Sequence, residues 1–257
     1  MRPVALLTDF GHADNYVGVL HAVIEREAPG ATRIDLGHGV EPGDIWGACF
    51  QLRCAWQHLP ATCVVMAVVD PGVGTERRAV VVTIGTRSLV APDNGIATAV
   101  PGAEAARILD WRRMGLDEPS RTFHARDLFA PAAARLACGT SDLELGDEIE
   151  VGSLQSCPLP EPKASPSGLE GVIMHVDHFG NLVTNVRGSE VGPSATATWR
   201  AGRTSRRVGT YGEAIPEEVV LLEGSAGFLE LAVNCGSAAD VTGLERGDTV
   251  VFSKGDD

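Results

Sequence analysis

The chain has 257 residues, of which 44% are hydrophobic and 21% are charged, so it has the composition of a globular protein with one large or two smaller domains. Its formal net charge of -13 argues against a protein that binds nucleic acid or an anionic membrane surface, because both need a basic face. No apolar run approaches the roughly 20 residues of a membrane span. Because the start of the chain passes directly into a predicted strand, we expect a cytoplasmic protein without a signal peptide.

The six cysteines form no C-x-x-C pair, and several lie in apolar segments. This usage is typical of reduced thiols in a cytosolic protein rather than of a disulfide framework or a zinc site. One H-x-x-H pattern, His175 and His178, has flanks that resemble a strand, so the two side chains would point to opposite faces. The sequence therefore predicts no metal site.

The first half of the chain alternates apolar strands with amphipathic helices. We expect strands at 4–7, 34–36, 62–69, 79–84 and 88–91, and helices at 16–28, 44–58 and 128–137. A strand–helix–strand–helix–strand order is typical of a parallel sheet with crossover helices. The predicted fold class is α/β, with an N-terminal α/β sandwich domain around a mostly parallel sheet.

The second half of the chain begins after a change of composition. Four prolines between 158 and 166 predict a Pro-rich linker at 158–168, between an N-terminal domain at 1–157 and a C-terminal domain at 169–257. Short apolar segments follow, with turn residues between them, at 171–176, 182–186, 195–199, 219–222, 228–233 and 249–252. Strands at such short spacing predict a small antiparallel β-barrel or sandwich.

Charged residues follow two of the predicted strands. Strand 62–69 ends in Asp70, and a turn rich in glycine brings Arg77 and Arg78 to the start of the next strand. Asp9 follows the first strand in the same way. Open α/β sheets place their sites at the carboxyl ends of strands, although a solvated turn would use the same residue types. Asp14 either adds a carboxylate to such a site or caps the helix behind it.

Neither a dinucleotide-binding fingerprint nor a P-loop follows the first strand. Two other features are ambiguous when taken alone. His124 lies at the start of a predicted helix, where a lone histidine is more often structural than catalytic. The segment 177–185 is rich in Asp and Asn around a glycine, which suits either a binding loop or a hairpin with Asx turns.

Taken together, five motifs in order resemble one family. They are Thr8–Gly11, the turn from Asp70 to Arg78, Pro92–Gly95, Phe123–His124 and His178–Asn185. This set resembles the S-adenosyl-L-methionine (SAM) hydroxide adenosyltransferases, or SAM hydrolases, of the fluorinase/chlorinase superfamily. The resemblance extends from residue 4 to residue 252.

The resemblance implies an N-terminal α/β domain, a C-terminal β-barrel and a homotrimer that binds its substrate between subunits. It implies attack of water or hydroxide on C5′ of SAM, which gives adenosine and L-methionine without a cofactor. The residues that would activate the water are Asp70, Arg77 and His124.

The same resemblance implies a set of substrate contacts. Asp9 would accept the ribose hydroxyls, and Asp14 would meet the methionine ammonium group. The other implied contacts are Asp177, Asn181 and Ser225 for ribose and methionine, Tyr211 for stacking on adenine, and the backbone near Val233 and Cys235 for the adenine edge. The chain departs from the halogenases at Ala226, where they have an Arg, and at Gly43 and Val183, where they have Trp.

Two alternatives remain open from the sequence. A SAM-dependent halogenase would have a Tyr in place of Asp70, so Asp70 together with His124 favours hydrolysis. A protein that binds adenosine or SAM with little turnover would carry similar contacts. Analysis of the products with and without halide separates these functions.

Overall fold

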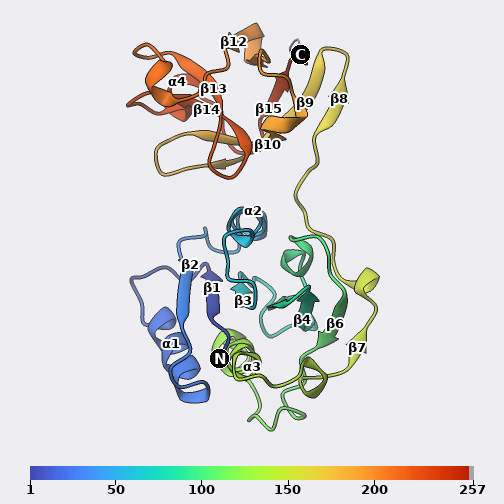
Figure 1. Ribbon diagram of the computed structural model, residues 1–257. Coiled ribbons are helices and arrows are strands. Elements are labelled where there is room, and N and C mark those ends of the chain that lie inside the picture. Colours follow the sequence, from blue (N-terminus) through green and yellow to red (C-terminus); the bar gives the residue numbers. More distant parts are fainter. Residues whose placement is uncertain (255–257) are drawn as a thin grey trace. The chain divides into compact units, whose positions relative to one another are not determined.

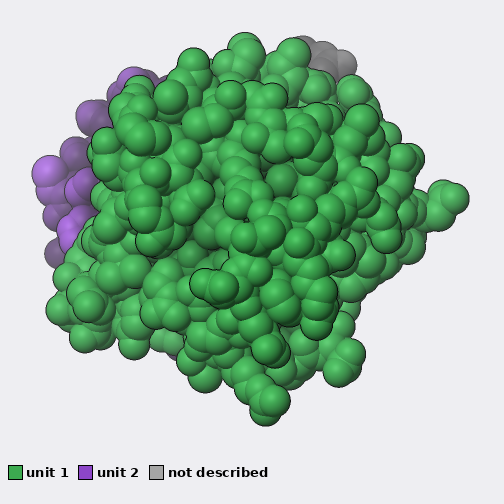
Figure 2. Space-filling view, turned by 90° about the horizontal axis from the view of Figure 1, so that it is seen from below, with its two compact units in different colours: residues 1–158 green, residues 159–257 purple. Residues whose placement is uncertain are grey.

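The computed structural model describes residues 1–254. The chain divides into two compact units, of which the first is Met1–Pro158 and the second begins at Leu159. Figure 2 colours the two units separately. Each unit is built around its own sheet. Within residues 1–254, no helix combines the length and the apolar character that crossing a membrane requires.

The first unit contains seven strands in one sheet, together with three α-helices. The strands are β1 (Val4–Thr8), β2 (Arg33–Gly37), β3 (Val64–Val68), β4 (Ala79–Ile84), β5 (Arg87–Pro92), β6 (Ala105–Ile108) and β7 (Glu148–Ile149). The helices are α1 (Tyr16–Glu27), α2 (Ile45–Trp56) and α3 (Ala130–Ala137), with a π-helix at Ala125–Phe129 and 3-10 turns at Ile96–Thr98, Asp142–Glu144 and Val151–Ser153.

The sheet of the first unit has the order β2-β1-β3-β5-β4-β6-β7. Pairing is parallel from β2 to β5 and antiparallel at β4, β6 and β7. The predicted α/β class is confirmed, and the sheet is mixed because β4 and β5 form a hairpin through Gly85 and Thr86. Strand β5 then pairs in parallel with β3 on its other side.

Helices cover both faces of this sheet (Figure 1). On one face, Leu20 and Ile24 of α1 and Leu136 of α3 pack against Leu6 and Met66 of the central strands. Helix α2 lies against the opposite face and is capped by Asp44, whose side chain accepts a hydrogen bond from the Gly47 N–H at 3.0 Å. Because the central strands are covered on both faces, they are almost entirely apolar.

One edge of this sheet collects charged side chains. The parallel strands β1, β3 and β5 all end there, and Asp9, Asp70 and Asp93 follow them. Strand β4 runs the other way, so it begins at this edge and carries Arg77 and Arg78 just before its first residue. The antiparallel placement of β4 therefore brings cations to the strand ends that carry the carboxylates.

The second unit is an antiparallel, nearly closed barrel, as predicted. Its strands are β8 (Lys163–Ser165), β9 (Gly168–Val176), β10 (Leu182–Arg187), β11 (Ala197–Trp199), β12 (Arg203–Ser205), β13 (Val219–Glu223), β14 (Phe228–Val233) and β15 (Thr249–Phe252). The helical segments are Gly188–Glu190, Arg200–Gly202, Tyr211–Glu213 and α4 (Ala238–Thr242).

The barrel has the order β12-β11-β15-β9-β10-β14-β13, with β8 paired to β9. Just beyond β12, the Val208 N–H donates to the Leu221 carbonyl at 2.8 Å, and this contact brings the two ends of the sheet together. Strand β8 lies inside the Pro-rich segment that we predicted as a linker. It fits between Pro162 and Pro166 because an edge strand leaves one row of backbone groups unpaired, which proline tolerates.

The loop that joins β9 to β10 makes a close contact through Gly180. A Cβ atom added at Gly180 would lie 2.3 Å from Ser237 Oγ, at a backbone φ of +82°. Gly247, in the same unit, has a φ of +94° but no atom within 4 Å of the same position. A side chain at Gly247 would meet only the strain of the positive φ, whereas a side chain at Gly180 would meet the same strain and also overlap Ser237.

We expect Gly180→Ala to destabilise the protein much more than Gly247→Ala. Gly247→Ala should cost about 1–2 kcal/mol, the usual penalty of a left-handed backbone conformation. Gly180→Ala adds the displacement of Ser237, so we expect a further loss of about 1–3 kcal/mol. Urea unfolding of both variants, followed by circular dichroism, measures the difference. Equal losses would show that Ser237 moves away without cost.

Candidate active site

A cavity of about 480 Å³ opens at the charged edge of the first unit. Segments far apart in the sequence contribute to its wall, each from a loop at a strand or helix end. The lining residues include Asp9, Phe10, Tyr16, Gly43, Asp70, Val73, Phe123 and His124. Three residues predicted for the site, Asp9, Asp70 and His124, therefore share one cavity.

Arg77 joins two of the predicted catalytic residues. Its Nε donates to Asp70 Oδ1 at 2.9 Å and to Oδ2 at 3.0 Å, and its Nη2 also contacts Oδ2. The same Nη2 lies 2.9 Å from His124 Nδ1. The side chains of Asp70 and Arg77 are 7% and 9% exposed, so this ion pair is nearly withdrawn from solvent. The structure thus brings the three residues into one hydrogen-bonded group.

The contact with Arg77 fixes the tautomer of His124. A guanidinium group only donates hydrogen bonds, so Nδ1 must accept and the ring proton must lie on Nε2. Burial, and then the positive charge of Arg77, lower the pKa of His124 below its ordinary value. His124 is therefore a neutral imidazole whose Nε2–H is a hydrogen-bond donor.

Neighbouring contacts hold the turn that carries Asp70 and Arg77. Asn94 Nδ2 donates to the Val69 carbonyl at 2.9 Å, directly before Asp70. Gly74 has a φ of +77°, and a Cβ atom there would lie 2.3 Å from the Arg121 carbonyl oxygen. The turn therefore requires glycine at this position, because any side chain would collide with backbone just before His124.

Arg78 has a structural contact rather than a place in the cavity wall. Its Nε donates to Asp93 Oδ2 at 2.7 Å, and Asp93 is 2% exposed. Asp93 Oδ1 accepts the Gln155 N–H at 2.8 Å. The Pro92–Gly95 motif therefore fastens the end of β5 to the segment that follows β7.

Asp9 and Asp14 differ in their surroundings. Asp9 Oδ2 accepts the Gly43 N–H at 2.8 Å, so the position where halogenases have a Trp here supplies a backbone donor. Asp14 is exposed, and the N-terminal cap residue of α1 is Asn15, with no side-chain hydrogen bond to the helix. The capping alternative for Asp14 is therefore not realised.

An aromatic cluster in the wall was not predicted from the sequence. The rings of Phe10, Tyr16 and Phe123 meet pairwise with centroids 5.2–5.8 Å apart. Tyr16 is 44% exposed although it contacts the other two rings. The sequence predicted a helix at 16–28 without assigning Tyr16 to the site, because periodicity does not tell a core face from a cavity wall.

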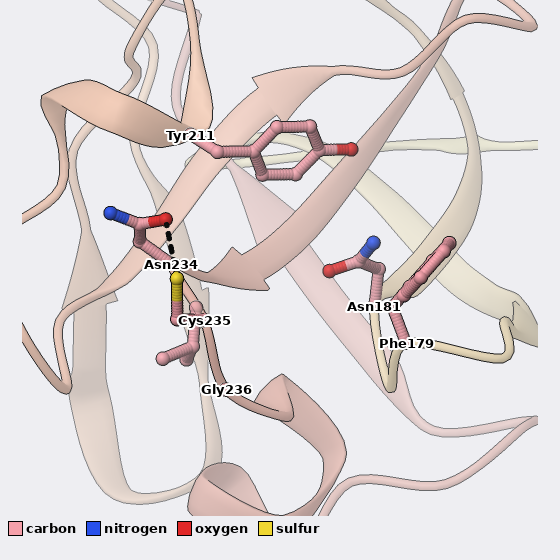
Figure 3. A pocket seen from close by; sticks show the side chains of 7 residues that line it. Phe179, Asn181, Tyr211, Asn234, Cys235 and Gly236 are labelled. Atoms are coloured by element: carbon pink, nitrogen blue, oxygen red, sulfur yellow. Dashed lines mark hydrogen bonds between the residues drawn. The ribbon is translucent and has the colours of Figure 1, made fainter.

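The second unit has its own cavity, of about 540 Å³ (Figure 3). Its lining residues are Phe179, Asn181, Tyr211, Val233, Asn234, Cys235 and Gly236. Four of them belong to the predicted substrate contacts. Cys235 has a φ of +56°, a conformation that residues other than glycine seldom adopt. The Val233–Gly236 turn therefore presents its backbone in an unusual arrangement beside Tyr211.

The predicted pair Asp177 and Asn181 builds the rim of this cavity. Asp177 Oδ1 accepts the Phe179 N–H at 2.8 Å and the Asn181 N–H at 2.9 Å, and Asp177 Oδ2 accepts from Asn181 Nδ2 at 2.9 Å. These are Asx-turn contacts, so the alternative of a hairpin with Asx turns is realised. Asn181 still lines the cavity, whereas Asp177 acts by shaping the loop.

Ser225 is separated from the other predicted residues of this unit. It lies in the turn between β13 and β14, whereas Val233 is the last residue of β14 and Cys235 lies just beyond that opposite end. A strand of six residues spans roughly 17 Å, so a ligand that contacts both ends must be extended. Arg187 lies beside this turn, with its guanidinium 4.5 Å from the centroid of the Phe228 ring. It brings a cation close to Ala226, where the halogenases have an Arg.

Glu230 is a buried carboxylate that the sequence analysis missed. It is 6% exposed and accepts a hydrogen bond from the hydroxyl of Tyr211. Burial raises the pKa of Glu230 above its ordinary value. A single Glu inside the apolar strand Phe228–Val233 is the signal that would have identified it.

Comparison with known families identifies the chain. Residues 4–146 match the SAM hydroxide adenosyltransferase N-terminal domain, and residues 171–251 match the C-terminal domain of the same family. The chain belongs to the SAM hydroxide adenosyltransferase family. A (R)-S-adenosyl-L-methionine hydrolase of Thermus thermophilus is 42% identical over 96% of this chain and 98% of the relative. A second such hydrolase, from Salinispora tropica, is 39% identical over 98% of both chains.

More distant members of the superfamily and a solved structure agree with this assignment. A fluorinase of an Actinoplanes species is 26% identical to this chain over 98% of the chain and 97% of the relative. The crystal structure of an uncharacterized conserved protein from Thermotoga maritima superposes with a TM-score of 0.91 at 34% identity, over 97% of this chain and 99% of that one. Both matches cover the two units.

The proton of His124 provides a test of the geometry. In wild-type protein, NMR titration should give His124 a pKa below the ordinary value of 6.5. In Arg77→Gln, loss of the guanidinium charge should raise this pKa. Because the pKa of His124 is lower in the folded state, neutral His124 contributes in full to the free energy of unfolding above its unfolded-state pKa. This contribution is lost as the pH falls through the folded-state pKa.

Arg78→Gln is the matched control, because Arg78 is the next residue but pairs with Asp93. It should leave the pKa of His124 unchanged. A His124 that titrates at the same pH in wild type and in Arg77→Gln would contradict the contact between Arg77 Nη2 and Nδ1.

Proposed function

We propose that this protein hydrolyses SAM to adenosine and L-methionine, with an activated water attacking C5′ of the ribose. The observation that carries the proposal is the bridge from Arg77 to Asp70 and His124 at the wall of a cavity. The two hydrolases that are about 40% identical to the chain over nearly its whole length support the same reaction.

The nucleophile limits this reaction. The sulfur of SAM carries a positive charge, so when the C5′–S bond breaks its electron pair stays on sulfur and methionine leaves as a neutral thioether. No general acid is needed. Water is a poor nucleophile, so a site gains most by positioning one water in line with the C5′–S bond and by removing its proton.

The geometry supports distinct roles for the three residues. His124 Nε2–H donates to the water oxygen, because its proton is fixed there by the contact of Nδ1 with Arg77. The carboxylate of Asp70 has about four lone-pair positions, and it retains capacity beside its bonds from Arg77 for one proton of the water. We assign Asp70 as the acceptor of that proton. The charge of Arg77 stabilises the hydroxide-like oxygen as the new C5′–O bond forms.

The remaining assignments concern substrate binding. Asp9 keeps one oxygen on the Gly43 N–H, and its other lone pairs are suited to the ribose hydroxyls. Asp14 is assigned to the methionine ammonium group. The second unit is assigned to the remaining contacts of the substrate. Asn181, Ser225 and the loop shaped by Asp177 are assigned to ribose and methionine. Tyr211 is assigned to stacking on adenine, and the backbone near Val233 and Cys235 to the adenine edge.

Purified protein should convert SAM to adenosine and methionine without halide, and Asp70→Asn or His124→Ala should lower turnover by about 10²–10⁴-fold. Adenosine binding should change little, because these residues act on the water rather than on the nucleoside. Chromatography of the products and calorimetry with adenosine measure the two effects.

Two outcomes would contradict the proposal. Formation of 5′-chloro-5′-deoxyadenosine in chloride, at the expense of adenosine, would indicate a halogenase. Tight adenosine binding with no turnover of SAM would indicate a binding protein. Arg78→Gln serves as the control, because it removes an arginine of the same turn that does not line the cavity.

We further propose that the protein acts as a homotrimer in which the first unit of one subunit and the second unit of a neighbour contribute to each site. Each unit carries only part of the proposed substrate contacts. Each cavity also leaves large side chains exposed, with Tyr16 at 44%, Tyr211 at 42% and Phe179 at 74%. Such exposure at a cavity rim favours coverage by a ligand or by a second copy of the chain.

Mixing two inactive variants tests this assembly. Asp70→Asn alters the first unit and Tyr211→Ala the second, so a trimer assembled from both contains sites in which both contributions are intact. After joint refolding of equal amounts, the mixture should recover about a quarter of the wild-type turnover, because random assembly leaves both contributions intact at one site in four, whereas each variant alone does not. Light scattering reports the oligomeric state. A monomer, or a mixture no more active than its parts, would contradict the proposal.

A further inference from the structure

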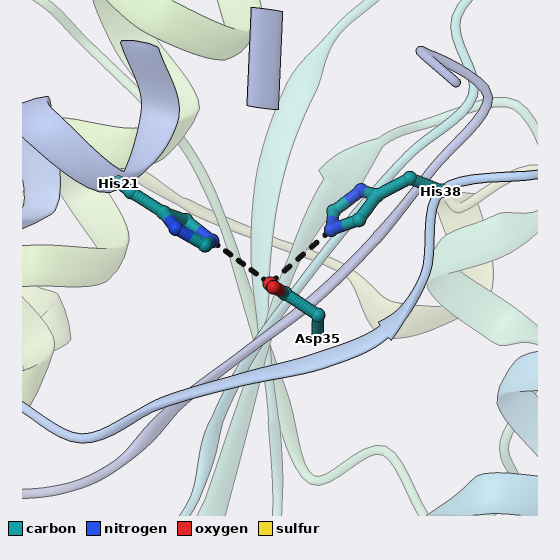
Figure 4. A group of neighbouring side chains, drawn as sticks. All are labelled: His21, Asp35 and His38. Atoms are coloured by element: carbon teal, nitrogen blue, oxygen red, sulfur yellow. Dashed lines mark hydrogen bonds and ion pairs between the residues drawn. The ribbon is translucent and has the colours of Figure 1, made fainter. Parts of the chain in front are cut away.

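We propose that His21, Asp35 and His38 form a binding site for a first-row divalent transition metal, of which Zn²⁺ is the reference ion. The three residues come from different parts of the first unit: His21 from α1, Asp35 from β2 and His38 from the loop after β2 (Figure 4). Each offers one ligand atom, and these atoms all lie within 4.8 Å of one another. The site is separate from the residues proposed for hydrolysis.

The spacing of the ligand atoms fits a metal of this size. Asp35 Oδ1 lies 2.9 Å from His21 Nε2 and 3.2 Å from His38 Nε2. Metal–ligand bonds of about 2.0–2.2 Å that meet at tetrahedral or octahedral angles place neighbouring ligand atoms about 2.8–3.5 Å apart. The two measured distances fall in this range, so small movements would admit the ion.

His38 gives the strongest indication of a ligand. It is 1% exposed, yet its Nε2 has no partner with hydrogen-bond geometry among residues 1–254, although it approaches Asp35. Its other nitrogen, Nδ1, lies 2.8 Å from Thr8 Oγ1. In the tautomer whose proton is on Nδ1, Thr8 Oγ1 accepts that proton and Nε2 presents its lone pair, which is the usual arrangement of a metal-binding imidazole.

The chemical types of the donors also suit a cation. Metals bind imidazoles in their neutral form and carboxylates in their ionised form. Two imidazoles and one carboxylate are a donor set that suits Zn²⁺, Co²⁺ or Ni²⁺ better than the all-oxygen sites of Mg²⁺ or Ca²⁺.

The cluster is accessible from solvent on one side. The side chains of His21 and Asp35 are 32% and 41% exposed, whereas His38 forms the buried wall. Water can therefore complete the coordination sphere at the open positions. The His38 carbonyl accepts the Gly11 N–H at 2.7 Å, so a bound ion would fasten α1 to the loop that carries Asp9.

Titration of the full chain with Co²⁺, a spectroscopic substitute for Zn²⁺, tests the proposal. We expect one Co²⁺ per chain, with visible ligand-field absorption and no thiolate-to-metal charge-transfer band. His21→Ala and Asp35→Asn should weaken binding by at least about 10–100-fold, the loss recorded even for outer partners of metal ligands. Both residues are partly exposed, so both variants should fold. His58→Ala removes an exposed histidine elsewhere and should bind Co²⁺ as the wild type does.

Thermal unfolding supplies a second readout. Zn²⁺ should raise the Tm of the wild type and of His58→Ala, but not that of His21→Ala, since an ion that binds only the folded chain stabilises it. No Co²⁺ binding at millimolar concentration would overturn the proposal, and so would equal binding by His21→Ala. A thiolate charge-transfer band would overturn it as well, by assigning the ion to cysteines such as Cys138 or Cys235, which are exposed.

Discussion

The guanidinium group of Arg77 donates to the carboxylate of Asp70 and to Nδ1 of His124 at once. An arginine keeps its charge at any physiological pH, so this contact is present throughout that range. It holds His124 neutral with its proton on Nε2, and it pairs with the nearly buried carboxylate of Asp70. Proton transfer from a water is best timed with formation of the C5′–O bond, when the water itself becomes more acidic.

The sheet topology explains why Arg77 can reach both partners. Asp70 follows β3, and Arg77 precedes β4, which starts at the edge where β3 and β5 end. In an all-parallel sheet, β4 would begin at the far edge, and the pair could not form between residues only seven positions apart in the sequence. Two contacts hold the turn between β3 and β4 in place. Asn94 donates a hydrogen bond to the Val69 carbonyl, and Gly74 packs closely against the backbone of Arg121. The reactive group thus depends on one reversal of strand direction and on backbone contacts around it.

The sequence predicted the individual strands and helices better than it predicted how they pack together. Apolar runs identified every central strand, and Asp70 with Arg77 stood out because a strand end and a short turn lie together in sequence. His124 lies 47 residues after Arg77, and only the family resemblance connected them. The sequence predicted a mostly parallel sheet, but it did not identify β4 as the strand that runs the other way, because hydrophobicity does not encode strand direction. Glu230 and the cluster around His38 were missed for a related reason: spacing along the chain does not reveal groups that meet across strands, and the one H-x-x-H pattern drew attention elsewhere.

The π-helix at Ala125–Phe129 completes the surroundings of Arg77. Its Ala130 N–H bonds to the Ala125 carbonyl, five residues back instead of four. This extra residue in the turn changes which side chains share a face, so His124 and Phe129, five positions apart, both meet the same guanidinium. Nδ1 of His124 accepts from Nη2, while the buried ring of Phe129 lies 5.2 Å from the guanidinium carbon. A regular α-helix would rotate residue 129 away by about 140° relative to residue 124. The π-helix therefore places the polar side chain of His124 and the apolar ring of Phe129 against the guanidinium of Arg77. These two contacts limit the orientations that the guanidinium group can adopt.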